Sequence, residues 1–191
     1  QIAADGAVPK PGGPPPPAVL FEDAAVVVID KPAGLLSVAT DQEKDDTAFT
    51  RVAAHLALRK AGRPFVVHRL DRGTSGVLIF ARTEAARDRI QNSWAWVEKT
   101  YIAAVEGVPQ PAEGTVINHL LEGGNLRVRP AAADTPGAKR AVSGYRTLGT
   151  HGRGALVTVE IATGRKHQIR VHLAGLGSPI AGDRDYGART D

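Results

Sequence analysis

The sequence predicts an α+β fold with a mixed, largely antiparallel central sheet flanked by helices. Three observations support this prediction. Residues 25–29 form a β-branched run, AVVVI, that is typical of a buried strand, and the apolar residues over 48–60 return with helical spacing. After residue 100 strand patterns dominate, and residues 155–161 alternate with the period of two that a half-buried strand shows.

The first predicted helix follows a turn and a cap. The KPAG sequence at residues 31–34 predicts a turn that ends the first strand. Thr47 is a suitable N-cap for a helix over about 48–60, because its hydroxyl can accept a backbone N–H of the first turn. Gly62 and Pro64 then end this helix.

A polar loop separates the next two predicted strands. These short strands lie at residues 65–68 and 77–81, and the loop between them covers Arg69–Gly76. Thr83 can cap a second helix that runs to about Trp96.

The second half of the chain is predicted to be mostly strands with one helix. The strands lie at residues 101–105, 115–120, 125–129, 140–148 and 155–161. Gly164 introduces a helix over about 166–175, with Ile169 and Leu173 on its buried face.

The N-terminal residues differ in composition from the rest. Residues 1–18 contain six prolines and several glycines, which predicts an extended arm followed by one domain over residues 19–191. The chain lacks Met and starts at Gln1, so we expect a portion of a longer protein. No apolar run approaches a membrane span and no signal-peptide pattern is present, which favours the cytoplasm.

Composition excludes several kinds of chemistry and points to a basic surface. The absence of Cys excludes disulfides, thiolate metal sites and cysteine nucleophiles. The net charge of +4 conceals two basic segments: residues 59–89 carry eight basic and three acidic side chains, and residues 139–172 carry seven and one. Brought together, the segments form a positive cleft for a polyanion; the alternative is separate solvated surfaces.

The loop HRLDRGTSG at residues 68–76 is the first candidate site. Strands bound it on both sides, and rigid elements commonly position functional loops in this way. Asp71 lies between Arg69 and Arg72, and neighbouring cations favour an ionised carboxylate. The alternative is a structural loop in which Asp71 pairs with an arginine.

The second candidate is TGRKHQIRVH at residues 163–172. Arg165 lies at the predicted helix start, where its guanidinium can reach back to Asp71, and Lys166 and Arg170 share a predicted helix face. His167 and His172 are five residues apart, which disfavours a metal site on a helix. The glycine clusters lack nucleotide-binding fingerprints, so no nucleotide cofactor is expected.

Several long motifs, in order along the chain, carry a resemblance to a known family. They are VVVIDKPAGLLS, HRLDRGTSG followed by VLIFA, EKTYIAAVEG, and TGRKHQIRVHLAGLGSPIAGDRDYG. Over about residues 20–187 the chain resembles the RluA-type RNA pseudouridine synthases. The resemblance implies the pseudouridine synthase fold with its active-site cleft. It also implies an isomerase that converts uridine to pseudouridine in rRNA or tRNA without a cofactor or metal.

The resemblance also implies a set of catalytic residues. Asp71 matches the catalytic aspartate, Tyr101 the active-site tyrosine and Arg165 the basic residue that pairs with the aspartate. Lys166 departs from the family, which has Thr or Ser there. Without the resemblance, Tyr101 is interpreted as a strand aromatic in the core.

RNA is the only partner expected, and the chain is expected to be a monomer. The cations expected to contact the RNA backbone are Arg69, Arg72, Lys99, Lys166 and Arg170. Such proteins usually continue past the DxxYG segment into a further strand, so the domain is expected to lack its C-terminal strand.

Two other functions remain as alternatives. A non-catalytic RNA-binding protein of the same fold is the first, although binding alone does not need Asp71, Tyr101 and Arg165 together. A small-molecule glycosidase is the second and would want another carboxylate near Asp71.

Overall fold

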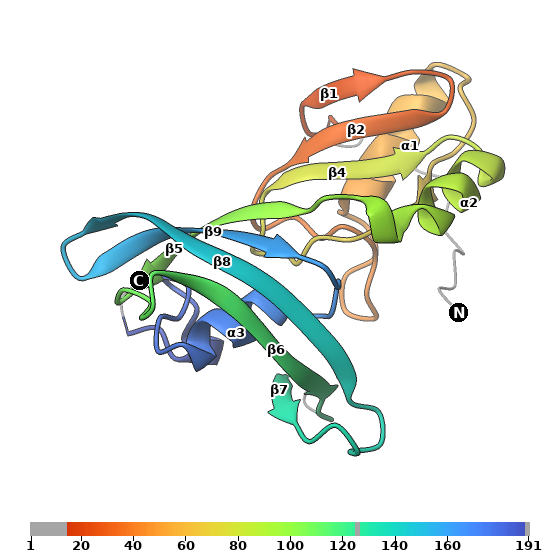
Figure 1. Cartoon of the computed structure of the whole chain (residues 1–191). Coiled ribbons are helices and arrows are strands. Elements are labelled where there is room, and N and C mark those ends of the chain that lie inside the picture. The colour runs from red at the N-terminus through yellow and green to blue at the C-terminus, as the bar shows by residue number, and fades with distance from the viewer. Residues whose placement is uncertain (1–14, 125–126, 190–191) are drawn as a thin grey trace. The chain divides into compact units, whose positions relative to one another are not determined.

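The computed structural model describes residues 15–124 and 127–189 and contains two compact units, the first ending at Trp94 and the second beginning at Ala95. Each unit has its own antiparallel sheet (Figure 1). The predicted α+β class is confirmed, with two sheets where the sequence predicts one central sheet. Most of the predicted arm, residues 1–14, lies outside the described residues. Pro17 is already buried, and the Ala18 carbonyl accepts a hydrogen bond from Asp30 N–H.

The sheet of the first unit has the strand order β1–β2–β4–β3. Its strands are β1 (Val19–Glu22), β2 (Val26–Lys31), β3 (Phe65–Val66) and β4 (Gly76–Ala81). In the register of β2 with β4, Val27 lies opposite Phe80 and Ile29 opposite Leu78, and all four side chains are fully buried. These residues form the apolar face that the β-branched run predicts.

Two helices of different character complete this unit. Helix α1 (Ala48–Leu58) starts at the predicted cap, where the Thr47 hydroxyl accepts a hydrogen bond from Thr50 N–H, and an edge-to-face contact joins Phe49 to Phe80 of β4. Helix α2 (Glu84–Asn92) begins after the predicted cap Thr83, and it buries none of its residues. It ends before Trp96, because residues 94–96 form the tighter 3₁₀ turn η1 (Trp94–Trp96).

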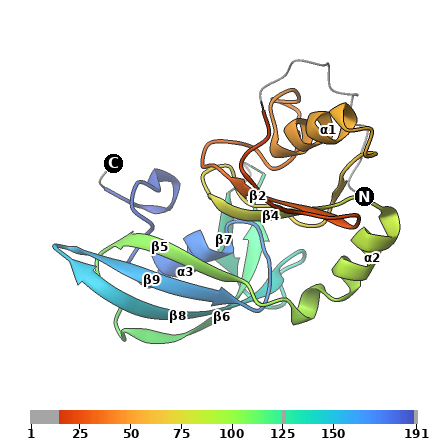
Figure 2. The ribbon, with the colours of Figure 1, turned by 90° about the horizontal axis from the view of Figure 1, so that it is seen from above.

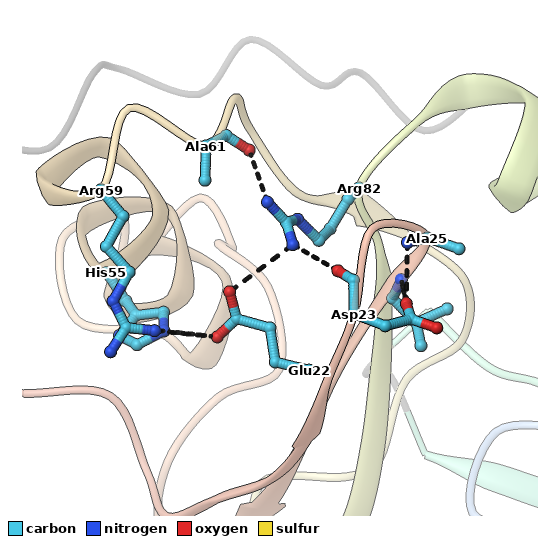
Figure 3. A network of polar contacts seen from close by, with 8 residues as sticks. Glu22, Asp23, Ala25, His55, Arg59, Ala61 and Arg82 are labelled. Atoms are coloured by element: carbon cyan, nitrogen blue, oxygen red, sulfur yellow. Dashed lines mark hydrogen bonds and ion pairs between the residues drawn. The ribbon is translucent and has the colours of Figure 1, made fainter.

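Strand β1 is not predicted from the sequence, and its place depends on a charged network (Figure 3). The Glu22 carboxylate lies 2.9 Å from His55 Nε2 and 3.1 Å from the Arg59 guanidinium, both on α1. Arg82, which follows β4, lies 3.6 Å from the same carboxylate and donates to the Asp23 carbonyl. Glu22 therefore ties the edge strand to both the helix and the sheet.

The sheet of the second unit has the strand order β5–β9–β8–β6–β7, with antiparallel pairing throughout. Its strands are β5 (Thr100–Glu106), β6 (Glu113–Glu122), β7 (Val128–Ala131), β8 (Lys139–His151) and β9 (Gly154–Ile161). Residues 155, 157 and 159 of β9 are buried while Leu156 and Glu160 are exposed, which confirms the predicted alternation. The expected strand 125–129 falls partly on residues outside the described ranges.

Helix α3 (Gln168–Gly175) packs on one face of this sheet (Figure 2). Leu173 is 1% exposed and lies in the core with Val157 and Val159. The helix begins two residues later than predicted, because His167 adopts a left-handed conformation with φ of 54°.

Candidate active site

Asp71 lies in the loop between β3 and β4, as the sequence predicts, and is half-buried. The preceding residue, Leu70, is buried, and Ser37 binds both of its backbone groups. Leu70 N–H donates to Ser37 Oγ at 3.0 Å, and the Ser37 hydroxyl donates to the Leu70 carbonyl at 2.7 Å. The backbone next to Asp71 is therefore held from the segment that follows β2.

Lys31 places a buried cation against the same loop. Its side chain is fully buried, and its ammonium donates to the carbonyls of Pro32, Leu35 and Arg72 at 2.9, 2.7 and 3.3 Å. Burial lowers the pKa of Lys31, and the negative charge of Asp71 opposes that shift by favouring the ammonium form. Lys31 thus supplies positive charge close to Asp71.

The two arginines beside Asp71 differ in their surroundings. Arg72 donates to the Gly34 carbonyl at 3.0 Å and pairs with Glu43 at 2.7 Å, so it joins the loop to the KPAG turn and the segment after it. Arg69 is exposed. Arg72 therefore pairs with Glu43 across the loop.

Tyr101 is the second residue of β5 in the other unit. It lies opposite Val159 in the register with β9, is half-buried, and packs against the core cluster that includes Leu173. Lys99, just before the strand, donates to the Val97 carbonyl. The sheet therefore sets the direction of the tyrosine ring.

Arg165 precedes α3 rather than starting it. Its side chain is exposed and its Nε–H donates to the Arg140 carbonyl at 3.0 Å. Its backbone N–H donates to Gln168 Oε1 at 3.0 Å, which ties this residue to the first turn of the helix.

The expected shared helix face of Lys166 and Arg170 is wrong, because Lys166 lies before α3. Lys166 forms an ion pair with Glu122 of β6. Arg170 binds both oxygens of Asp183 at 2.7 Å and approaches Asp185 at 3.1 Å, and the hydrogen bonds to Asp183 raise the pKa of this arginine further. Its guanidinium therefore holds the segment that follows α3.

The predicted site residues fall into two sets, one in each unit. The first unit brings Asp71 together with Lys31 and carries Arg69 and Arg72 on the same loop. Tyr101 and Arg165 belong to the second unit. That Asp71 acts together with these two residues is part of the proposal below.

The described residues contain neither a metal-binding cluster nor a membrane-spanning helix. Within residues 15–124 and 127–189, no group of three or more His, Asp or Glu side chains is arranged to hold a metal ion. In the same ranges, no helix has both the length and the apolar composition needed to cross a membrane.

Comparison with known proteins identifies the family. A family model described as RNA pseudouridylate synthase matches residues 25–175, most of the chain. An uncharacterized RNA pseudouridine synthase of Zymomonas mobilis is 38% identical over 168 residues, covering 86% of this chain and 76% of that protein. The chain belongs to the RNA pseudouridine synthases. This family consists of isomerases that convert uridine to pseudouridine in RNA, and nothing in these comparisons favours a non-catalytic function.

Other members of the pseudouridine synthase family agree. The dual-specificity RNA pseudouridine synthase RluA of Escherichia coli is 37% identical over 165 residues, covering 84% of this chain and 73% of that protein. The solved structure of human RNA pseudouridylate synthase domain containing 4 matches with a TM-score of 0.75 and 30% identity, over 88% of this chain and 68% of that one. The chain spans 53% of the ribosomal large subunit pseudouridine synthase D of Zymomonas mobilis, at 32% identity.

Several buried polar residues are not predicted from the sequence: Lys31 is predicted only as part of a turn, and Ser37, Gln168 and His172 have no predicted role. The available signal is a polar side chain close to apolar residues, such as Lys31 soon after VVVI. A buried polar residue needs a partner, but the pattern does not say which one.

Proposed function

We propose that this pseudouridine synthase acts on rRNA or tRNA, with Asp71, Tyr101 and Arg165 as the residues that act on the target uridine. The observation that carries this proposal is the half-buried Asp71, held by Ser37 through Leu70 and lying near the buried ammonium of Lys31. The loop therefore holds the carboxylate in a fixed position beside a positive charge, as a nucleophile or base requires.

The reaction is an internal rearrangement of the nucleoside. The N1–C1′ glycosidic bond breaks, the uracil turns, and C5 forms a bond with C1′. The C5 proton leaves to solvent while N1 gains a proton, so the reaction consumes no oxidant, reductant or energy source. Asp71 either attacks C1′ or removes the C2′ proton, and both routes need the ionised carboxylate.

Arg165 and Tyr101 have complementary roles in this proposal. The Arg165 guanidinium stabilises and orients the Asp71 carboxylate by a charge-assisted hydrogen bond. The Tyr101 ring stacks on the uracil, and its phenol assists removal of the C5 proton. The half-buried position of Tyr101 on β5 supports a stacking role, because one side of the ring is fixed by the core.

The target uridine must leave the RNA stack, at a cost of about a few kcal/mol. We propose that exposed Arg69 fills the vacated space or binds phosphate, and that Arg72, Lys99 and Lys166 contact the RNA backbone. We propose that Arg170 also contacts the RNA backbone, with its guanidinium held in place by two hydrogen bonds to Asp183.

The RNA class, the compartment and the oligomeric state are finer parts of the same proposal. The names of two relatives refer to dual specificity and to the large ribosomal subunit, which supports rRNA and leaves tRNA as a second substrate. We propose a cytoplasmic monomer that needs no protein partner.

Release of tritium from RNA labelled with [5-³H]uridine tests the proposal, because C5 loses its proton only when pseudouridine forms. Wild-type protein is expected to release tritium, and Asp71→Asn to slow release by about 10³-fold or more with little change in RNA affinity. If neither protein releases tritium while both bind RNA, the non-catalytic alternative is correct for this chain.

Arg165→Met tests whether Arg165 is the partner of Asp71 or a contact to RNA phosphate. It is expected to lower kcat much more than RNA affinity. An equal loss of both would make Arg165 a phosphate contact instead of the partner of Asp71.

A further inference from the structure

A buried polar side chain joins the start of α3 to the segment that carries Arg165. Gln168 is 3% exposed, and its Oε1 accepts two hydrogen bonds, from the Thr163 hydroxyl at 2.8 Å and from Arg165 N–H at 3.0 Å. Its Nε2 group donates to the Val142 carbonyl and to Ser143 Oγ, both at 2.9 Å. All four hydrogen-bonding positions of this amide are therefore used.

The network continues away from Arg165 into the core. Ser143 Oγ is 2.9 Å from His172 Nδ1, and His172 Nε2 is 2.9 Å from Asn118 Oδ1. Ser143 and His172 are 1% and 2% exposed. Because Asn118 Oδ1 only accepts, His172 Nε2 carries the proton and Nδ1 accepts from the Ser143 hydroxyl. The Ser143 oxygen then accepts the hydrogen bond from Gln168 Nε2, so the donor and the acceptor of every hydrogen bond in the chain are defined.

The other end of the network closes the turn before α3. Val142 N–H donates to Thr163 Oγ1 at 2.9 Å, so the Thr163 hydroxyl accepts from β8 while it donates to Gln168. Gln168 N–H donates to the Arg165 carbonyl at 3.1 Å while Gln168 Oε1 accepts from Arg165 N–H. Both backbone groups of Arg165 are therefore bound by one buried residue, whose own orientation is set by β8 and β6.

We propose that Gln168 is a positioning residue for Arg165: through Thr163 and the chain Ser143–His172–Asn118, it sets the backbone from which the Arg165 side chain extends. This inference rests on the proposed function, in which Arg165 orients Asp71. Catalysis depends on angstrom-scale placement of such groups, so a loosened turn lowers turnover more than RNA binding. If Gln168 only stabilised the fold, the effect of loosening this turn on kcat would not depend on the Arg165 side chain.

The test uses a hydroxyl deletion with a matched control. Thr163→Val removes both hydrogen bonds of the Thr163 hydroxyl with little change in shape, and Thr163→Ser keeps the hydroxyl. Thr147→Val is the control, because the Thr147 hydroxyl is buried with no hydrogen-bond partner among the described residues. We expect Thr163→Val to lower kcat for tritium release by about 10-fold with KM for RNA nearly unchanged. Thr163→Ser should recover most of the loss, and Thr147→Val should leave kcat unchanged.

A double-mutant cycle with Arg165→Met shows whether the effect passes through Arg165. In the Arg165→Met background, Thr163→Val should have almost no further effect on kcat. If it lowers kcat by the same factor in both backgrounds, or has no effect in the wild type, the inference is wrong. If Thr163→Val fails to fold, Ser143→Ala replaces it in the same cycle, with an expected loss of about threefold that also vanishes without Arg165.

The cycle also separates this inference from the proposed function. Loss of kcat in Arg165→Met without any effect of Thr163→Val overturns the inference alone. Full kcat in Arg165→Met overturns the role of Arg165 and the inference with it. A wild-type protein that releases no more tritium than Asp71→Asn overturns the proposed function itself.

Discussion

Ser37 is the residue that holds the backbone next to Asp71. It is 3% exposed and makes two hydrogen bonds with Leu70, one as acceptor and one as donor. Removing the hydroxyl leaves a buried N–H and a buried carbonyl without this partner, and unsatisfied buried groups carry a large desolvation cost. Its role is thus both to stabilise the first unit and to fix the loop of Asp71.

Ser37→Ala is expected to lower the free energy of unfolding by about 1–3 kcal/mol. Urea titration followed by circular dichroism measures the loss. Ser75→Ala provides the control, since Ser75 is exposed in the same loop and should change stability by less than about 0.5 kcal/mol. Equal losses in the two variants would show that the hydrogen bonds to Leu70 contribute nothing.

His172 titrates differently from a solvated histidine. Burial lowers its pKa from 6.5 to about 4, and its hydrogen-bonded neighbours Ser143 and Asn118 are uncharged. The unfolded chain therefore takes up a proton at higher pH than the folded chain does. The stabilisation from neutral His172 is complete above about pH 6.5 and is lost as the pH falls toward about 4.

At about 1.4 kcal/mol per unit, this shift amounts to about 3 kcal/mol of stability lost across that pH range. Unfolding free energies measured in urea from pH 7.5 to 4.5 should show this decline in the wild type. The decline should flatten in His172→Gln, which does not titrate. A wild-type curve that is level over the same range would mean that folding does not lower the pKa of His172.

At the scale of elements, the two helix caps predicted from sequence are confirmed. The two helices that they cap differ in how much they contribute to the core. Thr47 is fully buried and forms a capping box with Thr50, and α1 buries four residues. Thr83 also accepts a hydrogen bond from its helix, yet α2 buries no residue. A cap affects global stability only as far as its helix contributes to the core.

Thr47→Ala is therefore expected to cost about 1–2 kcal/mol, and Thr83→Ala about 0.5 kcal/mol or less. Chemical denaturation of the two variants compares them directly. Similar losses would indicate that α2 contributes as much to the core as α1.

Strand β1 shows where element prediction fails. Three of its four residues, Val19, Leu20 and Phe21, are apolar, yet all three are exposed, so the strand adds little to the core. Glu22 pairs with His55 and Arg59, and the hydrogen bond from His55 is the main cause of its lowered pKa. Because these partners lie 33 and 37 residues away, spacing along the chain does not reveal the contacts that place the strand.

On the scale of the whole molecule, several cations of the two basic segments, residues 59–89 and 139–172, are already paired with carboxylates in the fold. Lys166 pairs with Glu122, Arg72 with Glu43 and Arg170 with Asp183. Arg69 is exposed beside Asp71, and we propose that it binds phosphate.

RNA affinity is expected to fall steeply with salt, since each neutralised phosphate releases counterions. Arg69→Gln should reduce the slope of log K against log salt concentration by about 0.7 if its phosphate lies in a single-stranded region. Fluorescence anisotropy over a salt series measures the slope. The control is Lys44→Gln, which removes an exposed cation with no proposed RNA contact and should leave the slope unchanged. If wild type and Arg69→Gln show the same slope, Arg69 does not contact RNA phosphate.

Sequence alone was enough for the α+β class, for most strands and helices, for both N-caps and for the loop that carries Asp71. These depend on periodicity and capping between residues a few positions apart, which a single sequence displays. The tertiary structure decided what holds that loop, because Ser37 is 33 residues from Leu70 and Lys31 is 41 residues from Arg72. It also decided that Arg170 binds Asp183 and that Gln168 binds Arg165, since polar partners are chosen by packing in three dimensions rather than by spacing along the chain.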